Sequence, residues 1–393
     1  MVTHVPLGNI SKFVRGVTYK PADLIDNFSE NSIVCMRTAN IQAELDENDL
    51  KSIKSSVVKS IDKYLLEGDI LVSTANSWNL VGKCCWVKKL NYPAVPGGFI
   101  AALRVDKSKA DPRYVYHWFN SKKTQELARN CGRQTTNISN MDLKRCLSLE
   151  LPLPSLAEQR RIAAILDKVE ALRAKRREAI AKLDQLLQSV FLEMFGDPSS
   201  TSTKWPTLAL EEIANSRLGK MLDKKTSQGE SMKKYLANLN VQWGYFRLND
   251  LREMNFDANE QEEFSLEKGD ILMCEGGEPG RCAIWDNQIN DCYFQKALHR
   301  IRCKKEKCTP EYLSYLFFIL SKKDFFKSSV TTATIAHLPG IKLKKLKIPV
   351  PPLNNQEKFS QIYRLISLKK EKMKETFFLN DNLNKSLQHK YFK

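Results

Sequence analysis

Two long stretches of helix-forming residues separate regions in which short apolar runs alternate with turn residues. The first stretch, 157–195, contains neither Gly nor Pro and is rich in Ala, Leu, Arg, Lys, Glu and Gln, which favour helix. Gly196 and Pro198 follow it, as expected at the end of a helix. The pattern predicts one helix, roughly 55–60 Å long at 1.5 Å per residue. A second helical pattern runs over about 354–390.

Apolar residues recur along both helices at the spacing of a coiled coil. The positions that would face a partner helix are called the seam. In the first helix, eight of ten seam positions are apolar, namely Ile162, Ile165, Val169, Leu172, Ala179, Leu183, Leu186 and Val190. The second series is less regular and is interrupted at Lys369, Thr376 and Asn380; its apolar members are Phe359, Ile362, Ile366, Met373, Leu383 and Leu387. Sustained heptads favour a packed partner helix, so we expect the two helices to pair. Ordinary core packing inside one domain is the alternative.

The regions before the two helices predict short elements in the same order. Apolar runs bounded by turns predict strands at 69–73, 85–87 and 100–105, and again at 270–274, 283–285 and 298–301. Helical patterns cover 111–129 and 310–326. Both regions are therefore expected to be α+β.

The two halves of the chain repeat one another at a period of about 200 residues. Gly-Asp-Ile-Leu at 68–71 recurs at 269–272, and Leu-Glu-Leu-Pro-Leu-Pro-Ser-Leu at 149–156 is answered by Leu-Lys-Ile-Pro-Val-Pro-Pro-Leu at 346–353. Gln159 then matches Gln356. Matches in one order indicate a duplicated domain, and each copy ends at a proline element, which continues neither a sheet ladder nor a helix interior. We divide the chain into a first domain, a first long helix, a second domain and a second long helix, with bounds 1–154, 155–196, 197–351 and 352–393.

The chain is basic, with a formal net charge of +17 and a pI of about 9.3. Both halves carry the excess, which favours a polyanionic partner because each Lys or Arg that neutralises a phosphate releases counterions. A basic but solvated surface is the alternative. The ten cysteines form no Cys-x-x-Cys pair, so we expect no zinc. No charged-then-apolar leader and no 18-residue apolar stretch occur, so we expect a cytoplasmic protein with reduced thiols and no membrane span.

Polar and aromatic loop residues in both copies are candidates for DNA contact, because Arg pairs with guanine, Asn or Gln with adenine, and Glu with cytosine. In the first copy they are Arg37, Thr38, Asn40, Asn76, Trp78, Lys83, Arg133, Gln134 and Thr135. In the second copy they are Asn238, Asn240, Gln242, Trp243, Glu275, Glu278, Arg281, Gln295, His299 and Arg300. A structural role in a turn or core is the alternative for each single residue, whereas the loops taken as sets favour recognition.

The chain carries no familiar catalytic signature. It has no Gly-x-x-x-x-Gly-Lys-Ser/Thr loop, no Asn-Pro-Pro-Tyr-type methyltransferase motif and no His-Glu-x-x-His helix. We therefore expect a binding protein rather than an enzyme, without catalytic or metal-ligating residues. One alternative is a coiled-coil scaffold whose globular domains bind protein or RNA. Another is a self-contained methyltransferase or nuclease without a familiar motif.

The sequence around the first proline element resembles the specificity subunits of type I restriction-modification systems. The resemblance rests on Leu-Pro-Leu-Pro-Ser-Leu-Ala-Glu-Gln-Arg-Arg-Ile-Ala-Ala-Ile-Leu-Asp at 151–167 and Phe-Leu-Glu-Met-Phe-Gly-Asp at 191–197. The second copy of the proline element at 348–356 and the segments 237–244 and 275–281 add to it. The resemblance covers essentially the full length.

This resemblance implies two target-recognition domains in tandem, each reading one half of a bipartite DNA site. The long helices would pair as an antiparallel coiled coil and set the spacing between the halves. The implied partners are double-stranded DNA, two methyltransferase subunits that carry S-adenosylmethionine, and in a full complex motor-nuclease subunits; the chain itself would bind no cofactor. The residues implied for helix pairing and subunit docking are Gln159, Ile162, Ile165, Val169, Leu172, Leu183, Leu186, Val190, Gln356, Ile362 and Ile366.

Overall fold

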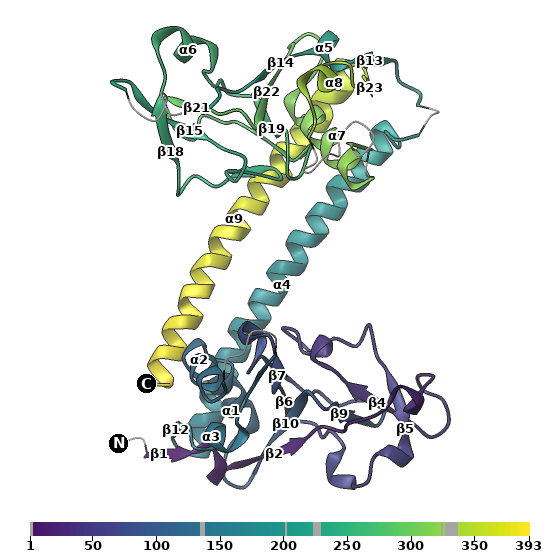
Figure 1. Ribbon diagram of the computed structural model, residues 1–393, viewed down its shortest axis with the longest axis vertical. Coiled ribbons are helices and arrows are strands. Elements are labelled where there is room, and N and C mark those ends of the chain that lie inside the picture. The colour runs from purple at the N-terminus through teal and green to yellow at the C-terminus, as the bar shows by residue number, and fades with distance from the viewer. Residues whose placement is uncertain (1–2, 134–137, 201–202, 223–228, 324, 327–336) are drawn as a thin grey trace. The chain divides into compact units, whose positions relative to one another are not determined.

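The computed structural model describes residues 3–133, 138–200, 203–222, 229–323, 325–326 and 337–393, except for the side chains of 377 and 378. The chain forms two compact units. Unit 1 comprises Met1–Arg176 and Glu375–Lys393, and unit 2 comprises Arg177–Lys374. Each unit therefore contains one globular domain, the first part of the helix that follows it and a part of the other long helix (Figure 1).

The globular domain of unit 1 is built on two four-stranded sheets. The first has the order β2 (Ser11–Arg15), β10 (Ile100–Val105), β6 (Ile70–Ser73), β8 (Cys84–Trp86) and is antiparallel throughout. The second has the order β3 (Leu24–Ile25), β5 (Ser52–Lys54), β4 (Ser32–Met36), β9 (Ala94–Pro96), with β4 and β9 parallel. Two strand pairs join β1 (Thr3–Pro6) to β12 (Glu150–Leu153) and β7 (Ala75–Asn76) to β11 (Ser139–Asn140).

Among the described residues of this domain there are also three α-helices and six short 3-10 helices. The α-helices are α1 (Pro112–Phe119), α2 (Lys122–Asn130) and α3 (Leu143–Leu147). The 3-10 helices are η1 (Leu7–Asn9), η2 (Pro21–Asp23), η3 (Thr38–Asn40), η4 (Ser55–Val57), η5 (Ile61–Lys63) and η6 (Trp78–Leu80). The single helix predicted over 111–129 is wrong in one respect: it is divided between α1 and α2. The hydroxyl of Ser121 accepts the Thr124 N–H and starts a new helix there.

The domain of unit 2 repeats the first sheet of the unit 1 domain, the one formed by β2, β10, β6 and β8. Its antiparallel order is β14 (Ala214–Leu218), β22 (Leu298–Cys303), β19 (Ile271–Cys274), β20 (Cys282–Ile284). A second sheet has the order β18 (Arg252–Asn255), β15 (Met232–Leu236), β21 (Cys292–Phe294), with β15 and β21 parallel. The smaller pairs are β13 (Thr207–Ala209) with β23 (Lys347–Pro349), and β16 (Val241–Gln242) with β17 (Tyr245–Phe246). Its helices are α5 (Leu210–Ile213), α6 (Ala258–Glu263), α7 (Pro310–Lys322) and α8 (Gly340–Lys344).

The repeated Gly-Asp-Ile-Leu motif forms the same turn and strand in both units. Gly68 and Gly269 have φ of +95° and +96°, a region that glycine adopts without steric cost. The buried aspartate that follows each glycine pairs with an arginine of the neighbouring strand, Asp69 with Arg104 and Asp270 with Arg302, at 2.7 Å in both cases. The motif therefore ties the start of an inner strand, β6 or β19, to the neighbouring inner strand and is structural.

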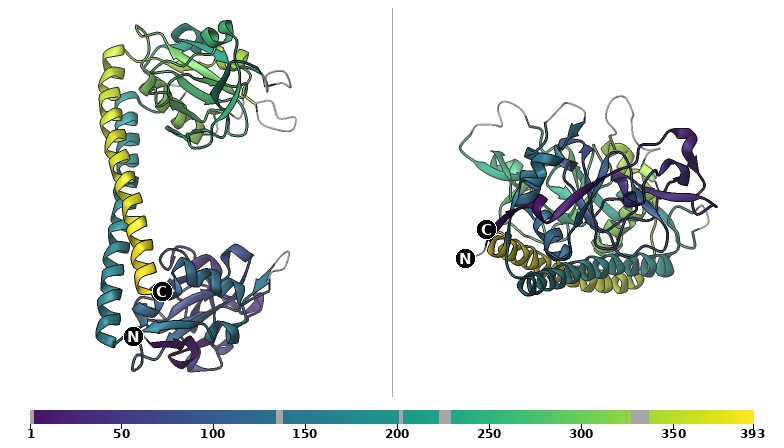
Figure 2. Two further views of the ribbon diagram at one scale, coloured as in Figure 1. Left: turned by 90° about the vertical axis from the view of Figure 1, so that its left-hand side faces the viewer. Right: turned by 90° about the horizontal axis from the view of Figure 1, so that it is seen from below.

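The two long helices, α4 (Leu156–Phe195) and α9 (Leu353–Tyr391), run antiparallel to each other within each unit (Figure 2). In unit 1, Arg173 pairs with Asp381 at 2.7 Å and Arg176 donates to the Thr376 carbonyl at 3.2 Å. In unit 2, Lys370 pairs with Asp184. The expected pairing of the helices is confirmed, and its middle is polar.

The seam predicted along these helices is displaced at several positions. Leu172, Leu186 and Leu383 are 49%, 51% and 48% exposed, so they do not lie in the pairing interface. The buried positions of α4 include Leu166 and Leu187, each one residue beyond a predicted seam position. The displacement arises because each end of a helix packs on a globular domain as well as on the other helix.

Candidate nucleic-acid interface and domain anchors

The structure joins the predicted DNA-contact loops of the first domain. Lys83 Nζ donates to Gln42 Oε1 at 2.7 Å, which connects the loop after β4 to the loop after β6. Asn76 belongs to β7, which pairs with β11, and Arg133 bridges to Asn140 beside it. Segments that are distant in sequence thus present Asn76, Lys83 and Arg133 together. Gln134 and Thr135 lie outside the described residues.

Arg37 and Thr38 lie at the start of the first of these loops. The Arg37 guanidinium donates to the Asp49 carboxylate at 2.7 Å and to its carbonyl at 2.9 Å. This hydrogen bond lowers the pKa of the Asp49 carboxyl. Thr38 is half-buried in η3. Arg37 therefore ties the start of the loop between β4 and β5 to Asp49 near its end.

The predicted loops of the second domain form one hydrogen-bonded surface. Asn238 Nδ2 donates to the Gly276 carbonyl at 2.8 Å, and Trp243 Nε1 donates to Glu278 Oε1 at 2.7 Å. Arg281 pairs with Glu278 at 2.9 Å and also donates to the Asn238 carbonyl at 3.1 Å. The segment 237–243 and the turn 275–281 are thus held against each other.

Three other predicted residues flank this surface. Gln242 Nε2 donates to the Leu239 carbonyl at 3.0 Å, within its own turn. Glu275 and Gln295 are half-buried. The Glu275 N–H donates to the Ala297 carbonyl at 2.9 Å, which places the turn 275–281 beside the β21–β22 connection that carries Gln295.

Three predicted contact residues are buried, and their assignment to DNA is wrong. Asn40 and Asn240 are 1% and 2% exposed; each accepts a backbone N–H three residues earlier and donates to carbonyls of its own loop. His299 is 1% exposed and its Nε2 bonds to the Leu338 carbonyl at 3.0 Å; burial lowers its pKa. These side chains shape the loops instead of reaching a ligand.

Arg300 is half-buried, and its predicted contact with DNA stays a prediction. Its Nη1 donates to the Glu263 and Ser265 carbonyls at 3.1 and 2.6 Å, and burial lowers its pKa. It lies in β22, which is paired on both sides by β14 and β19. Arg300 therefore braces a neighbouring loop. Its position in a central strand could not be distinguished from a loop edge by residue type alone.

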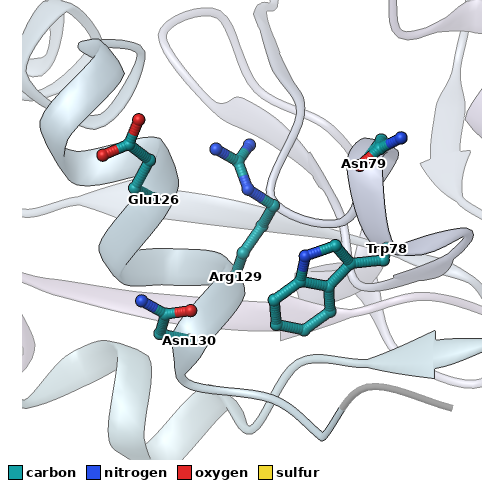
Figure 3. Close-up of a pocket in the computed structure, with 5 residues that line it drawn as sticks. All are labelled: Trp78, Asn79, Glu126, Arg129 and Asn130. Carbon is teal, nitrogen blue, oxygen red and sulfur yellow. The ribbon is translucent and has the colours of Figure 1, made fainter.

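A polar hollow of about 520 Å³ in the first domain lies between η6 and α2. It is lined by Trp78, Asn79, Glu126, Arg129 and Asn130 (Figure 3). Among the described residues, the Arg129 guanidinium has no ion-pair partner. An indole face beside arginine and amide groups is suited to nucleic acid, because bases stack on aromatic rings and arginine binds phosphates. Of these residues, only Trp78 was named from the sequence; Glu126, Arg129 and Asn130 come from α2, a helix that carries no loop signal.

Phe99 is a second feature that the sequence did not reveal. Its side chain is 62% exposed, although a phenylalanine before a strand pattern suggests a core residue. Its carbonyl accepts the N–H groups of Thr74 and Ala75, so it lies beside the strand that carries Asn76. Thus the candidate surface of the first domain includes an apolar side chain.

The glutamine of the proline element anchors each long helix to its own domain. Gln159 is 1% exposed; its Oε1 accepts the Asp111 N–H at 2.9 Å and its Nε2 donates to the Pro154 carbonyl at 2.8 Å. Gln356 is fully buried and makes the same contacts with the Thr309 N–H and the Pro351 carbonyl, at 3.0 and 2.8 Å. The prediction that these glutamines dock another subunit is wrong, because their polar atoms face inward.

The far end of each helix packs against the domain that the other helix follows. Phe195, near the end of α4, lies 4.9 Å from the ring of Tyr312, and Phe392, after α9, lies 5.5 Å from Tyr114. Each tyrosine hydroxyl donates to the carbonyl of a proline in the proline element, at 2.8 and 2.7 Å. The duplicated domain therefore has one docking site, and the opposite helix end fills it in each unit.

The residues predicted to form the helix seam divide accordingly. Ile162 is buried in the core of unit 1 and Ile366 in the core of unit 2. Val169 is also buried but lies outside both core clusters. Ile165, Leu183, Val190 and Ile362 are half-buried. Much of the predicted seam is therefore domain core.

The described residues contain one cluster with metal-ligand chemistry, formed by His117, Asp167 and Glu170. His117 Nε2 lies 2.7 Å from Asp167 Oδ1, and Arg113 Nε donates to the same oxygen at 2.6 Å. Burial opposes ionisation of Asp167, but the hydrogen bonds from His117 and Arg113 outweigh it and lower its pKa. A guanidinium on the shared oxygen explains the cluster as an ion-pair network between α1 and α4.

The fold and its loops define a duplicated recognition protein: two copies of one scaffold carry different loop chemistry and are tied together by long helices. The model of the type I restriction modification DNA specificity domain matches residues 4–182 and 202–376. The chain belongs to this family and is a type I DNA-specificity subunit. No helix among the described residues is long and apolar enough to span a membrane.

Relatives and solved structures agree with this assignment. The chain is 23% identical over 415 residues to the EcoKI specificity subunit of Escherichia coli strain K12, covering 99% of this chain and 88% of the relative. It is 22% identical to the StySPI specificity subunit of Salmonella potsdam, covering 89% and 79%. The crystal structure of the type I S subunit from M. genitalium shares the fold, with a TM-score of 0.61, 16% identity, and coverage of 100% and 96%.

Proposed function

We propose that each globular domain reads one half of a bipartite DNA site and that the long helices set the gap between the halves. The observation that carries this proposal is the contrast between equivalent loops. The loop between β6 and β8 presents Trp78 and Lys83, whereas the loop between β19 and β20 presents Glu278 and Arg281. Different donors and acceptors on one scaffold suit two different half-sequences.

Linking two reading domains makes the second contact intramolecular once the first has formed. Affinity then depends on the spacing between the half-sites as well as on their bases. The antiparallel ion pairs within each unit, such as Arg173–Asp381, hold the helices in register. This supports a role for the helices as a spacer.

The catalytic groups belong, in this proposal, to partner methyltransferase subunits that bind S-adenosylmethionine, and this chain supplies recognition alone. Leu186 and Leu383 lie at equivalent places, each 27 residues after the anchoring glutamine, and are 51% and 48% exposed. An exposed leucine at the same distance from each anchoring glutamine fits a pair of partner subunits. Motor-nuclease subunits would join the same assembly.

The test of sequence recognition uses the full chain expressed with its partner methyltransferase. Mapping of methylated adenines in the host genome is expected to give one bipartite motif. Arg133→Ala should relax the motif in one half only, and Gln295→Ala in the other half only, each lost base contact costing about 1–3 kcal/mol. A continuous motif, or changes in both halves from one substitution, would contradict two independent readers.

The scaffold alternative is tested by the purified chain on duplex DNA. We expect binding that weakens steeply as salt is raised from 50 to 200 mM, as counterion release requires. Binding to RNA or protein with no preference for the mapped duplex would favour the scaffold.

Partner docking is tested by Leu186→Glu and Leu383→Glu. Each substitution should remove one of two bound methyltransferase subunits, measured as complex mass by light scattering. Ile61→Glu is the matched control, since Ile61 is an exposed apolar residue of a globular domain. Unchanged mass in both helix variants would place docking elsewhere.

A further inference from the structure

Each long helix makes two corresponding polar contacts with its own domain. The first is the glutamine anchor, Gln159 or Gln356. The second lies eight residues further along the helix, at Asp167 or Arg364, which is about 12 Å at 1.5 Å per residue. One attachment leaves a domain free to tilt about it, whereas two attachments separated along the helix fix the tilt.

In unit 1 the second attachment joins α1 to α4. Arg113 Nε donates to Asp167 Oδ1 at 2.6 Å, and its Nη2 lies 3.5 Å from Glu170 Oε2. His117 adds a contact of 2.7 Å to the same Asp167 oxygen. The domain is therefore the basic partner and the helix is the acidic partner.

In unit 2 the polarity is reversed at the equivalent place. Arg364 Nε, on α9, donates to Glu311 Oε1, on α7, at 2.6 Å. Arg113 and Glu311 each directly precede the tyrosine whose hydroxyl bonds to the proline element. Here the domain is acidic and the helix is basic, so the contact has been kept while both residues have changed sign.

We propose that these two ion pairs are struts that fix the tilt of each recognition domain on its helix, and thereby sharpen the gap that the protein accepts between half-sites. The consequence for the gap rests on the proposed function. Apolar packing along the helices is non-directional, whereas a pair of hydrogen-bonded charges tolerates little displacement. The struts supply a directional contact beyond the glutamine anchor, where each helix meets its own domain.

Because the polarity is reversed, neither long helix could replace the other at the ion pair with a domain. A helix like α9 under the first domain would set Arg364 against Arg113. A helix like α4 under the second domain would set Asp167 and Glu170 against Glu311. Like charges in such a site cost more than an exposed pair contributes, so charge complementarity selects the correct joint more than it adds stability. A recognition domain is thus portable between the two positions only together with its helix residue.

The strut of unit 2 gives the cleaner experiment, because only two residues form it. Arg364→Asp sets two carboxylates against each other, and Glu311→Arg with Arg364→Asp installs the polarity that unit 1 already uses. Lys358→Glu is the matched control: it makes the same charge change on an exposed residue of α9. All are made in the full chain.

Tilt is measured without DNA by electron–electron distance measurements between spin labels at Glu253→Cys and Glu371→Cys, two exposed positions of unit 2. The native cysteines are buried or half-buried. The distance distribution should broaden in Arg364→Asp and return to the original width in the double variant and the control. An unchanged width in Arg364→Asp, or a broad distribution in the double variant, overturns the strut.

The gap is measured with the partner methyltransferase on DNA in which the two half-sites are one base pair closer or further apart. In Arg364→Asp the preference for the correct gap should fall about tenfold, equivalent to about 1.4 kcal/mol, and the double variant should restore it. Asp167→Arg tests the other strut in the same way. If the original chain shows no bipartite site, the proposed function fails; if it does and Arg364→Asp keeps full gap preference, the struts do not act on the gap.

Discussion

Replacing Gln159 by leucine removes the hydrogen bonds of the helix anchor while keeping a side chain of similar size. The Asp111 N–H and the Pro154 carbonyl would lose their partners in a site where the glutamine is 1% exposed. Each buried group left unsatisfied costs about 1–3 kcal/mol, and two groups with partial relief by water give about 2–4 kcal/mol. The free energy of unfolding of unit 1 should fall by that amount.

Gln356→Leu provides an internal comparison. Gln356 makes the two equivalent bonds and a third, from Nε2 to the Lys307 carbonyl at 3.1 Å. Its loss should therefore destabilise unit 2 by more than Gln159→Leu destabilises unit 1. The order of the two effects follows from the number of bonds and not from helix propensity.

The assay is denaturant unfolding of the full chain combined with hydrogen exchange. Exchange at the Asp111 amide should accelerate in Gln159→Leu, and exchange at the Thr309 amide in Gln356→Leu, because those N–H groups donate to the glutamines. Gln185→Leu, an exposed position of α4, is the control. Stability within about 0.5 kcal/mol of the original chain, the usual range for surface substitutions, would refute the anchoring role.

Three further outcomes are expected. Phe195→Ala should destabilise unit 2 by about 3–5 kcal/mol, since it empties a buried aromatic site against Tyr312; calorimetry that shows unit 2 unchanged would remove this contact from the core. Burial lowers the pKa of His299, so the unfolded chain takes up a proton as pH falls through about 6.5 while the folded chain does not. The melting temperature should therefore drop from pH 7.5 to 5.5, and His299→Gln should reduce that drop; equal drops in both proteins would contradict the linkage. Phe99→Ala should weaken DNA binding by about 1 kcal/mol with unchanged stability, because the ring is 62% exposed beside the candidate interface; titration of labelled duplex measures it, with Ile61→Ala as the neutral control.

Elements with local signals were predictable from the sequence. The helix expected at 157–195 spans Leu156–Phe195, and the strand expected at 100–105 is Ile100–Val105. Helix formers without Gly or Pro, and apolar runs bounded by turns, act over a few residues and do not depend on distant contacts. The duplication was equally visible, since it is a property of the sequence itself.

The faces of the helices depended on tertiary contacts. Leu172 and Leu186 fit the heptad pattern but are exposed. Leu187 does not fit the pattern and was not predicted to lie in the seam, but it is buried. A strict heptad assumes that only another helix covers the seam, but here a globular domain covers each end. The reversed ion pairs at Arg113 and Glu311 carried no local signal for the same reason.

The candidate interface was predictable as a set of loops and not as single residues. Residue type placed Asn40, Asn240 and His299 among possible base readers, but their polar groups close backbone turns or meet a buried carbonyl. Whether an asparagine points at solvent or at its own loop depends on φ and ψ angles that composition does not contain. The sequence by itself determined two copies, two helices and a basic chain without a familiar catalytic motif. The tertiary structure decided which side chains remain free to meet DNA, because burial is a property of contacts between distant segments.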